Sequence, residues 1–559
     1  MLPLAVAVPL GMGFVLALMP AKKPRISDAL TNLATLVLLI LAVALLGRQG
    51  VYRVGGWAPP VGINLVLDGL SGLMLLTVAV VSLAATLFSI RYMDHYTARP
   101  KYYALFMLMV AGMNGAILTG DMFNLFVFIE IAAISSYALV AFGCGEQELE
   151  ASFKYAILGS VASSLILLAV AILYCQFGTV NMAHLGRKLA EVAPGDAARR
   201  VGLYSLVLFM GGFGLKAALV PFHAWLPDAH PSAPAPISAM LSGVLIKAIG
   251  VYALVRVVFN VFGVTAAVAQ ALMVLGTLSM VVGVFLAIAQ WDFKRLLAYH
   301  SISQIGYVML GIGVGGAVIA KGGNQAVAAL AIVGGLYHLV NHAVFKSLLF
   351  LTAGAVEYTT GTRQLQEMGG LRQRMPVTAG TSLVASMSIA GVPPFNGFVS
   401  KFVIILACVL ARYYGYAAWA VFVSIMTLAS FMKVQKYAFF GTLGERWKAL
   451  REVPFAMGLS MVLLAVLCAG MSLMIIPGAR AAMLDPAQAG LVERANYIEK
   501  VLGPKVPEAP PAEEVPPEPS ASLEGAGAAA DEAAHEDKPI VAKGKIGIPQ
   551  TTGGGRCAE

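Results

Sequence analysis

Charged side chains are scarce in this sequence. Asp, Glu, Lys and Arg make up 12% of the 559 residues, whereas hydrophobic residues make up 59%. A soluble globular domain carries about 25% charged residues, so the composition excludes the ordinary soluble class. The mean hydropathy is +0.80, and apolar runs recur along most of the chain. Because such a run needs roughly 20 residues to cross a bilayer as a helix, the sequence predicts a polytopic membrane protein.

Clustered cysteines are also missing. The sequence has no CxxC pair, and its five cysteines are scattered, at Cys144, Cys175, Cys408, Cys468 and Cys557. This pattern indicates no iron–sulfur, zinc or disulfide framework. No dinucleotide fingerprint or flavin motif is present either, so we expect no cofactor, no metal and no electron-transfer chemistry on this chain. The net charge of +9 is spread over loops and forms no basic run, which argues against a nucleic-acid partner.

The apolar runs predict an all-α fold with about fourteen transmembrane helices. Lipid-exposed spans must satisfy their own backbone hydrogen bonds, and no run alternates as barrel strands do. The first run has neither a preceding basic residue nor a following cleavage site, so we expect a retained span rather than a signal peptide. The predicted spans are 2–20, 29–47, 63–89, 103–120, 122–142, 155–175, 203–222, 235–258, 264–289, 295–316, 325–356, 376–410, 414–438 and 454–476.

Basic residues in the short loops predict the orientation. By the positive-inside rule, both termini lie on the non-cytoplasmic side of the inner (cytoplasmic) membrane. The longest loop on that side, 176–202, is itself basic and argues against this assignment. The loops assigned to the cytoplasm contain Lys22, Lys23 and Arg25; Arg91, Arg99 and Lys101; Lys294 and Arg295; Arg363, Arg372 and Arg374; and Arg446, Lys448 and Arg451.

The C-terminal region differs in composition from the rest. Residues 478–502 are predicted to form a short surface helix. From about residue 503 the chain is rich in Pro, Ala and Glu and nearly free of large apolar residues. Such a segment cannot bury enough surface to fold alone, so we expect disorder there.

Several ionisable residues lie far from the ends of the predicted spans. Each costs at least about 2.5–3.5 kcal/mol at a bilayer centre, so such residues usually face a protein interior or a water-filled path. One helical face carries three of them one turn apart, within the stretch "LYHLVNHAVFKSLLF". The candidates are Glu130, Lys216, Lys247, the His338, His342 and Lys346 stripe, and Lys401.

Two of these residues lie beside Gly/Pro interruptions. Lys216 stands between Gly211, Gly212, Gly214 and Pro221, and Lys401 follows "GVPPFNGF". Corresponding broken helices in two halves of a chain point to an inverted-repeat transporter with its sites near the middle of the membrane.

Structural roles for these residues remain open. Each lysine could be structural, and Glu130 could be a neutral carboxyl that locks helices together. His338 and His342 have the spacing of two zinc ligands, but no third ligand is near in sequence. His230 and Asp228 lie in a predicted loop, where capping or turn roles are equally plausible. An acid with lysines and histidines distributed over five spans suits proton transfer better, because histidine and buried lysine both titrate near neutrality.

Four motifs resemble the antiporter-like subunits of the respiratory complex I superfamily, which includes Mrp antiporters and energy-converting hydrogenases. The similarity runs in order over roughly residues 60 to 475. The motifs are "KAALVPFHAWLPDAHPSAPAPISAMLSGVLIKAIGVYALVR", "KRLLAYHSISQIGYV", "LYHLVNHAVFKSLLFLTAGAV" and "GVPPFNGFVSKF".

The resemblance implies fourteen helices, two inverted five-helix repeats and two broken helices. It implies a proton relay in which Glu130 pairs with Lys216, Lys247 connects, His338 and His342 bridge the halves, and Lys401 is the terminal group. Some members carry glutamate in that last place. Lys346, His300, Ser301 and Ser303 are secondary candidates. The family's long lateral helix has no counterpart in this sequence.

We therefore expect a proton-translocating subunit of a redox-driven complex. A redox module elsewhere in that complex would supply the energy. The expected partners are other membrane subunits, a peripheral iron–sulfur module, lipid, and protons or Na⁺. Alternatives are a subunit of an Mrp-type Na⁺/H⁺ antiporter and an inert scaffold; a solute carrier is disfavoured because the charges are spread out. The expected parts are 1–102 N-terminal helices, 103–258 and 259–440 the two repeats, 441–477 the last span, and 478–559 a polar tail.

Overall fold

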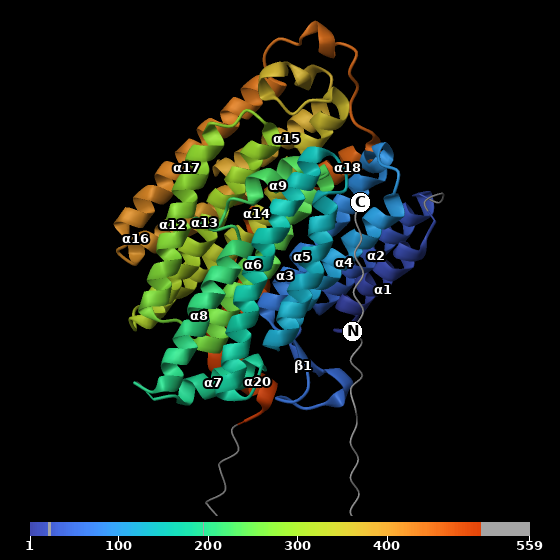
Figure 1. The fold of residues 1–559 in the computed structure, drawn as a ribbon. Helices are drawn as coiled ribbons and strands as arrows, with labels where there is room; N and C mark the ends of the chain where they lie inside the picture. Colours follow the sequence, from blue (N-terminus) through green and yellow to red (C-terminus); the bar gives the residue numbers. More distant parts are fainter. Residues whose placement is uncertain (21–23, 194, 505–559) are drawn as a thin grey trace, which may run out of the picture. The chain divides into compact units, whose positions relative to one another are not determined.

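The structure, a computed structural model, describes residues 1–20, 24–193 and 195–504. Helices make up most of this part (Figure 1). Eleven helical segments in it are long and apolar enough to cross a membrane, and three shorter apolar helices accompany them. The chain is thus a mostly helical, multi-pass membrane protein, as the sequence predicted. Lys22, Lys23 and the predicted tail from Lys505 lie outside the described residues.

The first half begins with two helices at one flank and ends at a fully buried segment (Figure 1). Its helices are α1 (Leu4–Leu18), α2 (Pro24–Leu45), α3 (Gly69–Tyr92), α4 (Arg99–Leu118), α5 (Met122–Val140), α6 (Glu146–Phe177), α7 (Met182–Glu191), α8 (Ala197–Lys216), α9 (Leu226–Ser232), α10 (Ala235–Met240), the π-helix η3 (Leu241–Tyr252), α11 (Ala253–Arg256) and the π-helix η4 (Val257–Phe262). The last four run without a break as one span, Ala235–Phe262.

The second half lies beside that segment and forms the opposite flank (Figure 1). Its helices are α12 (Ala266–Ile288), α13 (Phe293–Ala320), α14 (Gln325–Thr360), α15 (Pro376–Ala390), α16 (Asn396–Leu410), α17 (Tyr414–Val434), α18 (Phe455–Gly470), α19 (Pro477–Val492) and α20 (Arg494–Leu502). A two-stranded antiparallel hairpin, β1 (Gly50–Arg53) with β2 (Asn64–Leu67), pairs Gly50 with Leu67 and precedes α3.

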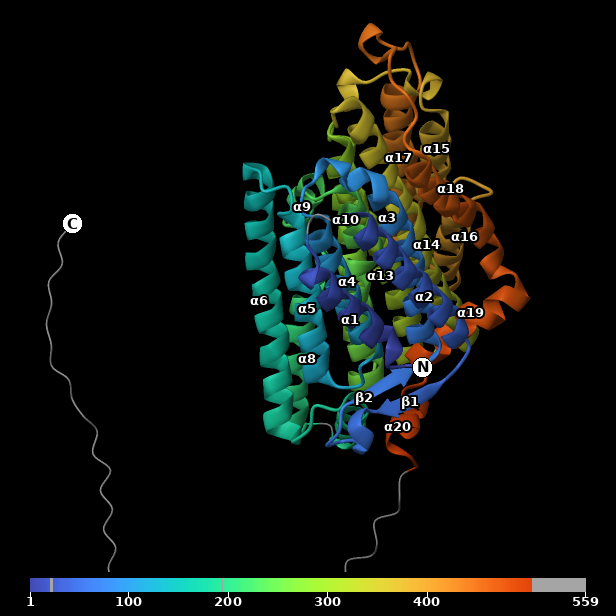
Figure 2. The ribbon, with the colours of Figure 1, turned by 90° about the vertical axis from the view of Figure 1, so that its right-hand side faces the viewer.

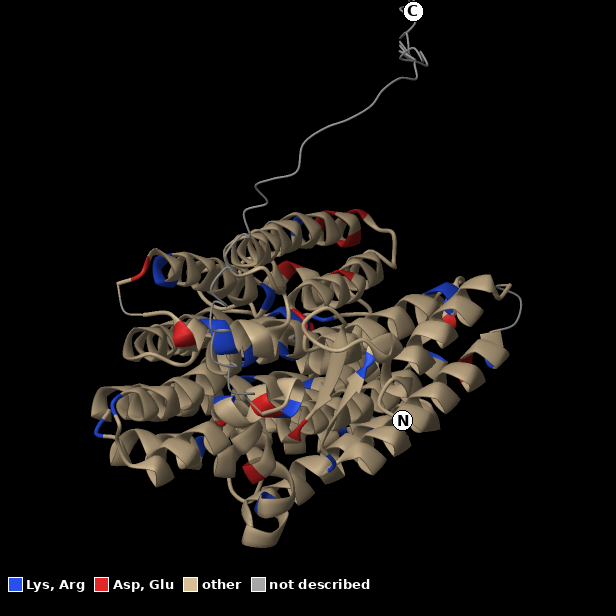
Figure 3. Cartoon of the chain, turned by 90° about the horizontal axis from the view of Figure 1, so that it is seen from below, with Lys and Arg blue, Asp and Glu red and all other residues tan. Residues whose placement is uncertain are grey.

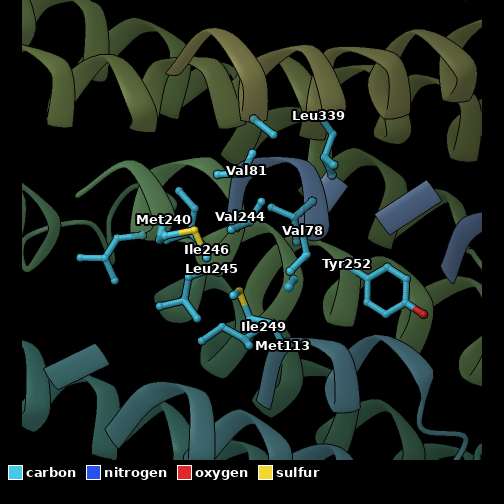
Figure 4. Packing of buried hydrophobic residues seen from close by; sticks show 14 of the residues in the cluster. Val78, Val81, Met113, Met240, Val244, Leu245, Ile246, Ile249, Tyr252 and Leu339 are labelled. Carbon is cyan, nitrogen blue, oxygen red and sulfur yellow. The ribbon is translucent and has the colours of Figure 1, made fainter. Parts of the chain in front are cut away.

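Burial separates central from peripheral helices. In the most apolar 18-residue stretch of each span, all residues are buried in Ala235–Phe262 and 94% in Phe293–Ala320, but only 33% in Phe455–Ile475. Figure 4 shows why: Val244 and Ile249 of η3 interdigitate with Val78 of α3, Met113 of α4 and Leu339 of α14. The central helices therefore face protein on all sides, and ionisable residues on them are shielded from lipid.

Both predicted interruptions are present. Helix α8 ends at Lys216 and the chain becomes helical again at Leu226; α15 ends at Ala390 and α16 begins at Asn396. At the first break the Trp225 indole N–H donates to the Leu215 carbonyl at 3.0 Å, which satisfies a backbone group that the helix end leaves free. At the second, Gly391 caps α15 in the left-handed region, at φ +80°.

The predicted basic loops of the second half share one end of the bundle. Arg363 pairs with Asp292 at 3.2 Å, and the Trp447 indole donates to the Glu367 carbonyl at 3.1 Å, so the connections that follow α12, α14 and α17 meet there. Elsewhere the ribbon is largely free of charge, with Lys and Arg confined to short stretches (Figure 3). Long apolar spans joined by charged turns are what a bilayer requires.

Residues 477–502 differ from the single surface helix that the sequence predicts. They form two helices, and α19 packs on the start of α3, with Leu484, Ala487 and Leu491 buried. A Cβ on Gly69 would lie 2.2 Å from the Pro486 carbonyl, so only glycine permits this approach. The shorter α20 lies beside the hairpin (Figure 2).

Candidate functional site

The first cluster lies at the broken helix of the first half. Lys216, 3% exposed, ends α8, and its Nζ is 3.5 Å from Oε1 of Glu130 on α5. The Ser163 hydroxyl on α6 donates to the same carboxyl oxygen, and Nζ of Lys216 also lies 3.5 Å from the Tyr137 hydroxyl. Because 25% of the Glu130 side chain is exposed, the pair connects the buried interior with the outer face of α5.

The second cluster lies in the π-helical segment. Lys247 is fully buried on η3, and its Nζ donates to the Ser242 carbonyl, five residues earlier. The Ser242 hydroxyl is 2.7 Å from that of Ser301 on α13. No carboxylate forms an ion pair with Lys247 in the described part of the chain. π-Helical turns occur often at functional sites, where they re-aim a side chain.

The histidine stripe is buried on the longest helix, α14. His338 lies between two partners, the Ser400 hydroxyl at 2.9 Å and the Gln304 Oε1 at 3.2 Å. His342 lies one turn on, with its ring centroid 6.4 Å from that of His338. Neither its ring nitrogens nor Nζ of Lys346 has a hydrogen-bond partner among the described residues. Buried polar groups of this kind are usually satisfied by ordered water.

The last cluster lies after the second break. Nζ of Lys401 on α16 donates to the Ile389 carbonyl at 2.7 Å and lies 3.4 Å from the Ser424 hydroxyl. The ammonium also stands over the Tyr307 ring, 4.8 Å from its centroid. This lysine, unlike Lys216, has carbonyl, hydroxyl and aromatic neighbours and no carboxylate partner within the described residues.

The secondary candidates fall into different environments. Ser301 lies beside the Lys247 cluster, and Lys346 continues the stripe, 5.5 Å from the Phe350 ring centroid. His300 binds the Ser430 hydroxyl at 2.8 Å, and Ser303 donates to the Met280 carbonyl at 3.0 Å. The bond of Ser303 ties α13 to α12, which is a structural contact.

The predicted loop at His230 is wrong. Asp228 and His230 lie on the short helix α9, which the sequence does not suggest because Pro227 and Pro231 lie within it. His230 is fully buried against Phe350, at 4.6 Å between ring centroids, and neither ring nitrogen has a partner in the described chain. Asp228 instead pairs with Arg295 near the surface.

Sequence reasoning missed two ion pairs of buried cations, and in one of them the carboxylate is buried as well. Nζ of Lys294 is 2.7 Å from Oε2 of Glu357, although Lys294 was assigned to a basic loop. Arg256 binds Asp68 through two hydrogen bonds, at 2.7 and 2.8 Å. Burial by itself raises the pKa of Asp68, but the Arg256 guanidinium outweighs it and holds that pKa below its usual range. Arg256 lies two residues from the end of the predicted span 235–258, so the rule that selected Lys247 passed over it.

Among the described residues, none is placed as a third zinc ligand beside His338 and His342. In residues 1–20, 24–193 and 195–504, no group of three or more His, Cys, Asp or Glu residues is placed to hold a metal ion. The polar neighbours of His338 are a serine and a glutamine, which make hydrogen bonds rather than complete a zinc site.

Comparison with known proteins matches this arrangement to a family. The family model described as NADH:quinone oxidoreductase/Mrp antiporter, transmembrane, matches residues 119–428, more than half of the chain. The chain belongs to this family. A second model, described as the N-terminus of chain 5 of NADH-ubiquinone oxidoreductase (complex I), matches residues 57–103 of this antiporter-family chain. The predicted resemblance is confirmed.

Relatives in the family have different names. The chain is 37% identical over 454 residues to NADH-quinone oxidoreductase subunit N of Desulforudis audaxviator, covering 80% of this chain and 85% of that protein. It is 35% identical over 444 residues to a Na⁺/H⁺ antiporter subunit of Alkalihalophilus pseudofirmus, covering 78% and 86%. A chain in the Mrp complex from Dietzia sp. DQ12-45-1b superposes with a TM-score of 0.80 at 30% identity, covering 90% of this chain and 99% of that one.

Proposed function

We propose that this chain is a proton-translocating, antiporter-like subunit of a multisubunit, redox-driven membrane complex. The observation that carries the proposal is the series of buried ionisable groups through the central helices, from the Glu130–Lys216 pair to Lys401. Burying each of these groups is costly, and a purely structural core would not need so many. Subunit N of an NADH-quinone oxidoreductase is among the relatives, which supports a redox-driven assembly.

The proposed relay works by coupled charges. A proton exchanges at Glu130 and Lys216, passes by way of Lys247 and the His338–His342 stripe, and leaves near Lys401. Each charge changes the proton affinity of the next group, because a nearby negative charge stabilises the protonated form of a titratable group and a nearby positive charge destabilises it. His342 lies on α14, and α14 packs against both η3, which carries Lys247, and α16, which carries Lys401. Water at its unpartnered nitrogens would complete the path.

The finer architecture belongs to the same proposal. We infer about fourteen spans, two inverted five-helix repeats over 103–258 and 259–440, and an inner-membrane location with both termini outside the cytoplasm. The breaks after Lys216 and Ala390 and the shared end of the basic loops support this assignment. Redox chemistry and its cofactors would belong to partner subunits, which include other membrane subunits and a peripheral iron–sulfur module.

Two variants test the relay against a structural scaffold. The changes are Lys216→Ala and Glu130→Gln, with proton movement into membrane vesicles measured per assembled complex. The relay predicts normal assembly with transport largely lost. The scaffold predicts reduced assembly with unchanged transport per complex. Normal pumping by both variants would end the proposal.

A subunit of an Mrp-type Na⁺/H⁺ antiporter is the second candidate, favoured by the similarity to the Alkalihalophilus pseudofirmus antiporter subunit and to the Mrp complex. Purification of the intact complex through a C-terminal tag, followed by mass spectrometry of the accompanying chains, separates the two. Iron–sulfur, hydrogenase or quinone-reactive subunits would identify a redox pump. Small membrane subunits alone would identify a gradient-driven antiporter, and Na⁺ flux would then be measured.

A further inference from the structure

A groove of about 550 Å³ runs between α12 and α17, on the outer flank of the second half. Its walls combine aromatic rings with apolar side chains from the N-terminal half of α12. Tyr414 is 62% exposed and Trp419 46% exposed, so these rings are open to the surroundings. The lining residues that matter are Val274, Leu278, Arg412, Tyr413, Tyr416 and Trp419.

Two cations stand at the mouth of this groove. Arg412 is exposed and follows α16, and exposed Lys321 follows α13. Nζ of Lys321 lies 3.0 Å from the Tyr413 hydroxyl and 5.3 Å from the centroid of that ring. Neither cation forms an ion pair with a carboxylate among the described residues. The positive charge at the mouth is therefore uncompensated within the described chain.

Lys321 and Arg412 lie at the end of the bundle opposite the predicted cytoplasmic loops. The groove opens where α12 begins, whereas Lys294 and Arg363 cluster where α12 ends. In the proposed orientation the groove end faces away from the cytoplasm, so the positive-inside bias does not account for Lys321 and Arg412.

The backbone at Arg412 adds an independent observation. The residue has φ +62°, and the Tyr413 N–H donates to the Cys408 carbonyl at 2.8 Å, as in a Schellman cap that normally carries glycine. A long side chain in this region is strained. Backbone strain at a single position such as Arg412 indicates a functional role for its side chain.

A second groove provides a contrast within the same molecule. It also measures about 550 Å³ and lies on the outer face of α6, lined by residues such as Phe153, Ile157, Ser160 and Leu168. Among the described residues, no basic side chain lines it. This groove can accept an acyl chain but has no means of selecting a headgroup.

We propose that the α12–α17 groove binds an anionic phospholipid. Arg412 and Lys321 hold the headgroup phosphate, and Tyr413 and Tyr416 lie at headgroup level, as aromatic side chains do at a membrane interface. Tyr416 is held in place by Gln270, whose side-chain N–H₂ donates to its hydroxyl at 2.7 Å. One acyl chain follows Val274, Leu278 and Trp419 toward the membrane interior.

The experiment uses the intact complex in nanodiscs with phosphatidylglycerol that carries a diazirine on one acyl chain. Matched phosphatidylcholine serves as the neutral probe. Cross-linked peptides of α12, α17 and α6 are quantified by mass spectrometry, and the phosphatidylglycerol-to-phosphatidylcholine ratio is read at each groove. The variants are Arg412→Gly and Lys321→Gln, with Arg200→Gln as control. Arg200 is an exposed cation in the first turn of α8, far along the chain from the groove.

We expect each groove variant to lower the ratio at α12 and α17 about fivefold, since one cation near an anionic membrane surface contributes about that factor. The double variant should lower it roughly twentyfold or more. The control and the α6 peptides should not change. Because Arg412→Gly also relieves backbone strain, its thermal stability should not fall, so a lost preference cannot be assigned to unfolding.

Three results would overturn the proposal. One is an unchanged ratio in the double variant. Another is displacement of the lipid by excess inorganic phosphate, which would show a free-anion site. The third is loss of a neighbouring subunit from the variant complex without change in the lipid ratio, which would mean that an acidic protein surface occupies the groove.

Discussion

The two broken helices place a lysine in different surroundings. At the first break, Lys216 has a carboxylate partner in Glu130, and that carboxylate is partly exposed. At the second, Lys401 has only the Ile389 carbonyl, the Ser424 hydroxyl and the Tyr307 ring among the described residues. Similar interruptions of the backbone therefore support two electrostatically distinct sites.

In the proposed relay, this difference would give proton transfer a direction. A lysine beside a carboxylate can keep its proton without an isolated buried charge, because the pair compensates. A buried lysine without a counter-ion favours the neutral form and gives its proton up readily. The first site is therefore suited to holding a proton and the second to passing it on.

The largest expected effect comes from replacing each lysine by methionine. Both Lys216→Met and Lys401→Met should reduce proton transport at least about tenfold, because each removes a proton-carrying group. Their stabilities should differ. Lys216→Met leaves Glu130 without its partner and should cost about 1–2 kcal/mol, a buried-pair cost reduced by the partial exposure of Glu130. Lys401→Met leaves no carboxylate without a partner, so the free energy of unfolding should stay unchanged or increase.

The measurement is proton uptake per assembled complex together with the thermal midpoint of the purified complex. Lys448→Met is the matched control, because that lysine is exposed in a surface turn beside Glu445. It should change neither quantity. Equal destabilisation by both buried-lysine variants would show that the two sites are electrostatically alike.

A carboxylate added at the second site should make it resemble the first. In Ser424→Asp the new carboxylate would lie where the hydroxyl now stands, 3.4 Å from Nζ of Lys401. It would stabilise the charged lysine and slow release of its proton, so we expect transport to fall about fivefold, equivalent to about 1 kcal/mol. The control is Ser424→Asn, which is similar in shape and uncharged. A similar loss in both would assign the effect to packing.

The sequence predicted the individual groups of this comparison but not their surroundings. Lysines and histidines in apolar runs are visible because lipid excludes them, and the Gly/Pro breaks are visible because they end helices. The two partners of His338 come from helices 34 and 62 residues away along the chain, so no local pattern encodes them.

Local signals misled where two rules conflicted. Prolines around His230 favour a loop, yet Pro227 lies in the first turn of α9, where a missing N–H costs nothing. Lys294 counted as a loop cation because it lies near the end of a span, although tertiary packing buries it against Glu357. The pairing of Asp68 with Arg256 joins residues 188 positions apart, which a single sequence cannot reveal.

The two histidines of the stripe allow a smaller comparison. His338→Phe removes the partner of the Gln304 Oε1 and one partner of the Ser400 hydroxyl, which keeps its bond to the Asn396 carbonyl, and should destabilise by about 1–2 kcal/mol. His342→Phe strands no partner within the described chain, so its cost should stay below about 0.5 kcal/mol. Chemical denaturation of the purified complex measures both, and transport should fall in both. A larger cost for His342→Phe would mean that its water partners hold the helices together.

The smallest expected effect concerns the hydroxyl groups near each lysine. In Tyr137→Phe the lost contact with Nζ of Lys216 is 3.5 Å long, which is the limit for a hydrogen bond, and Glu130 remains. We expect a stability change below about 0.5 kcal/mol. Ser424→Ala removes the 3.4 Å contact with Nζ of Lys401 and also the 2.9 Å hydrogen bond that the hydroxyl donates to the Ala390 carbonyl, so about 1 kcal/mol is expected. A larger loss of stability in Tyr137→Phe than in Ser424→Ala would show that the Glu130 carboxylate is not the main partner of Lys216. The electrostatic difference between the two broken helices would then be contradicted.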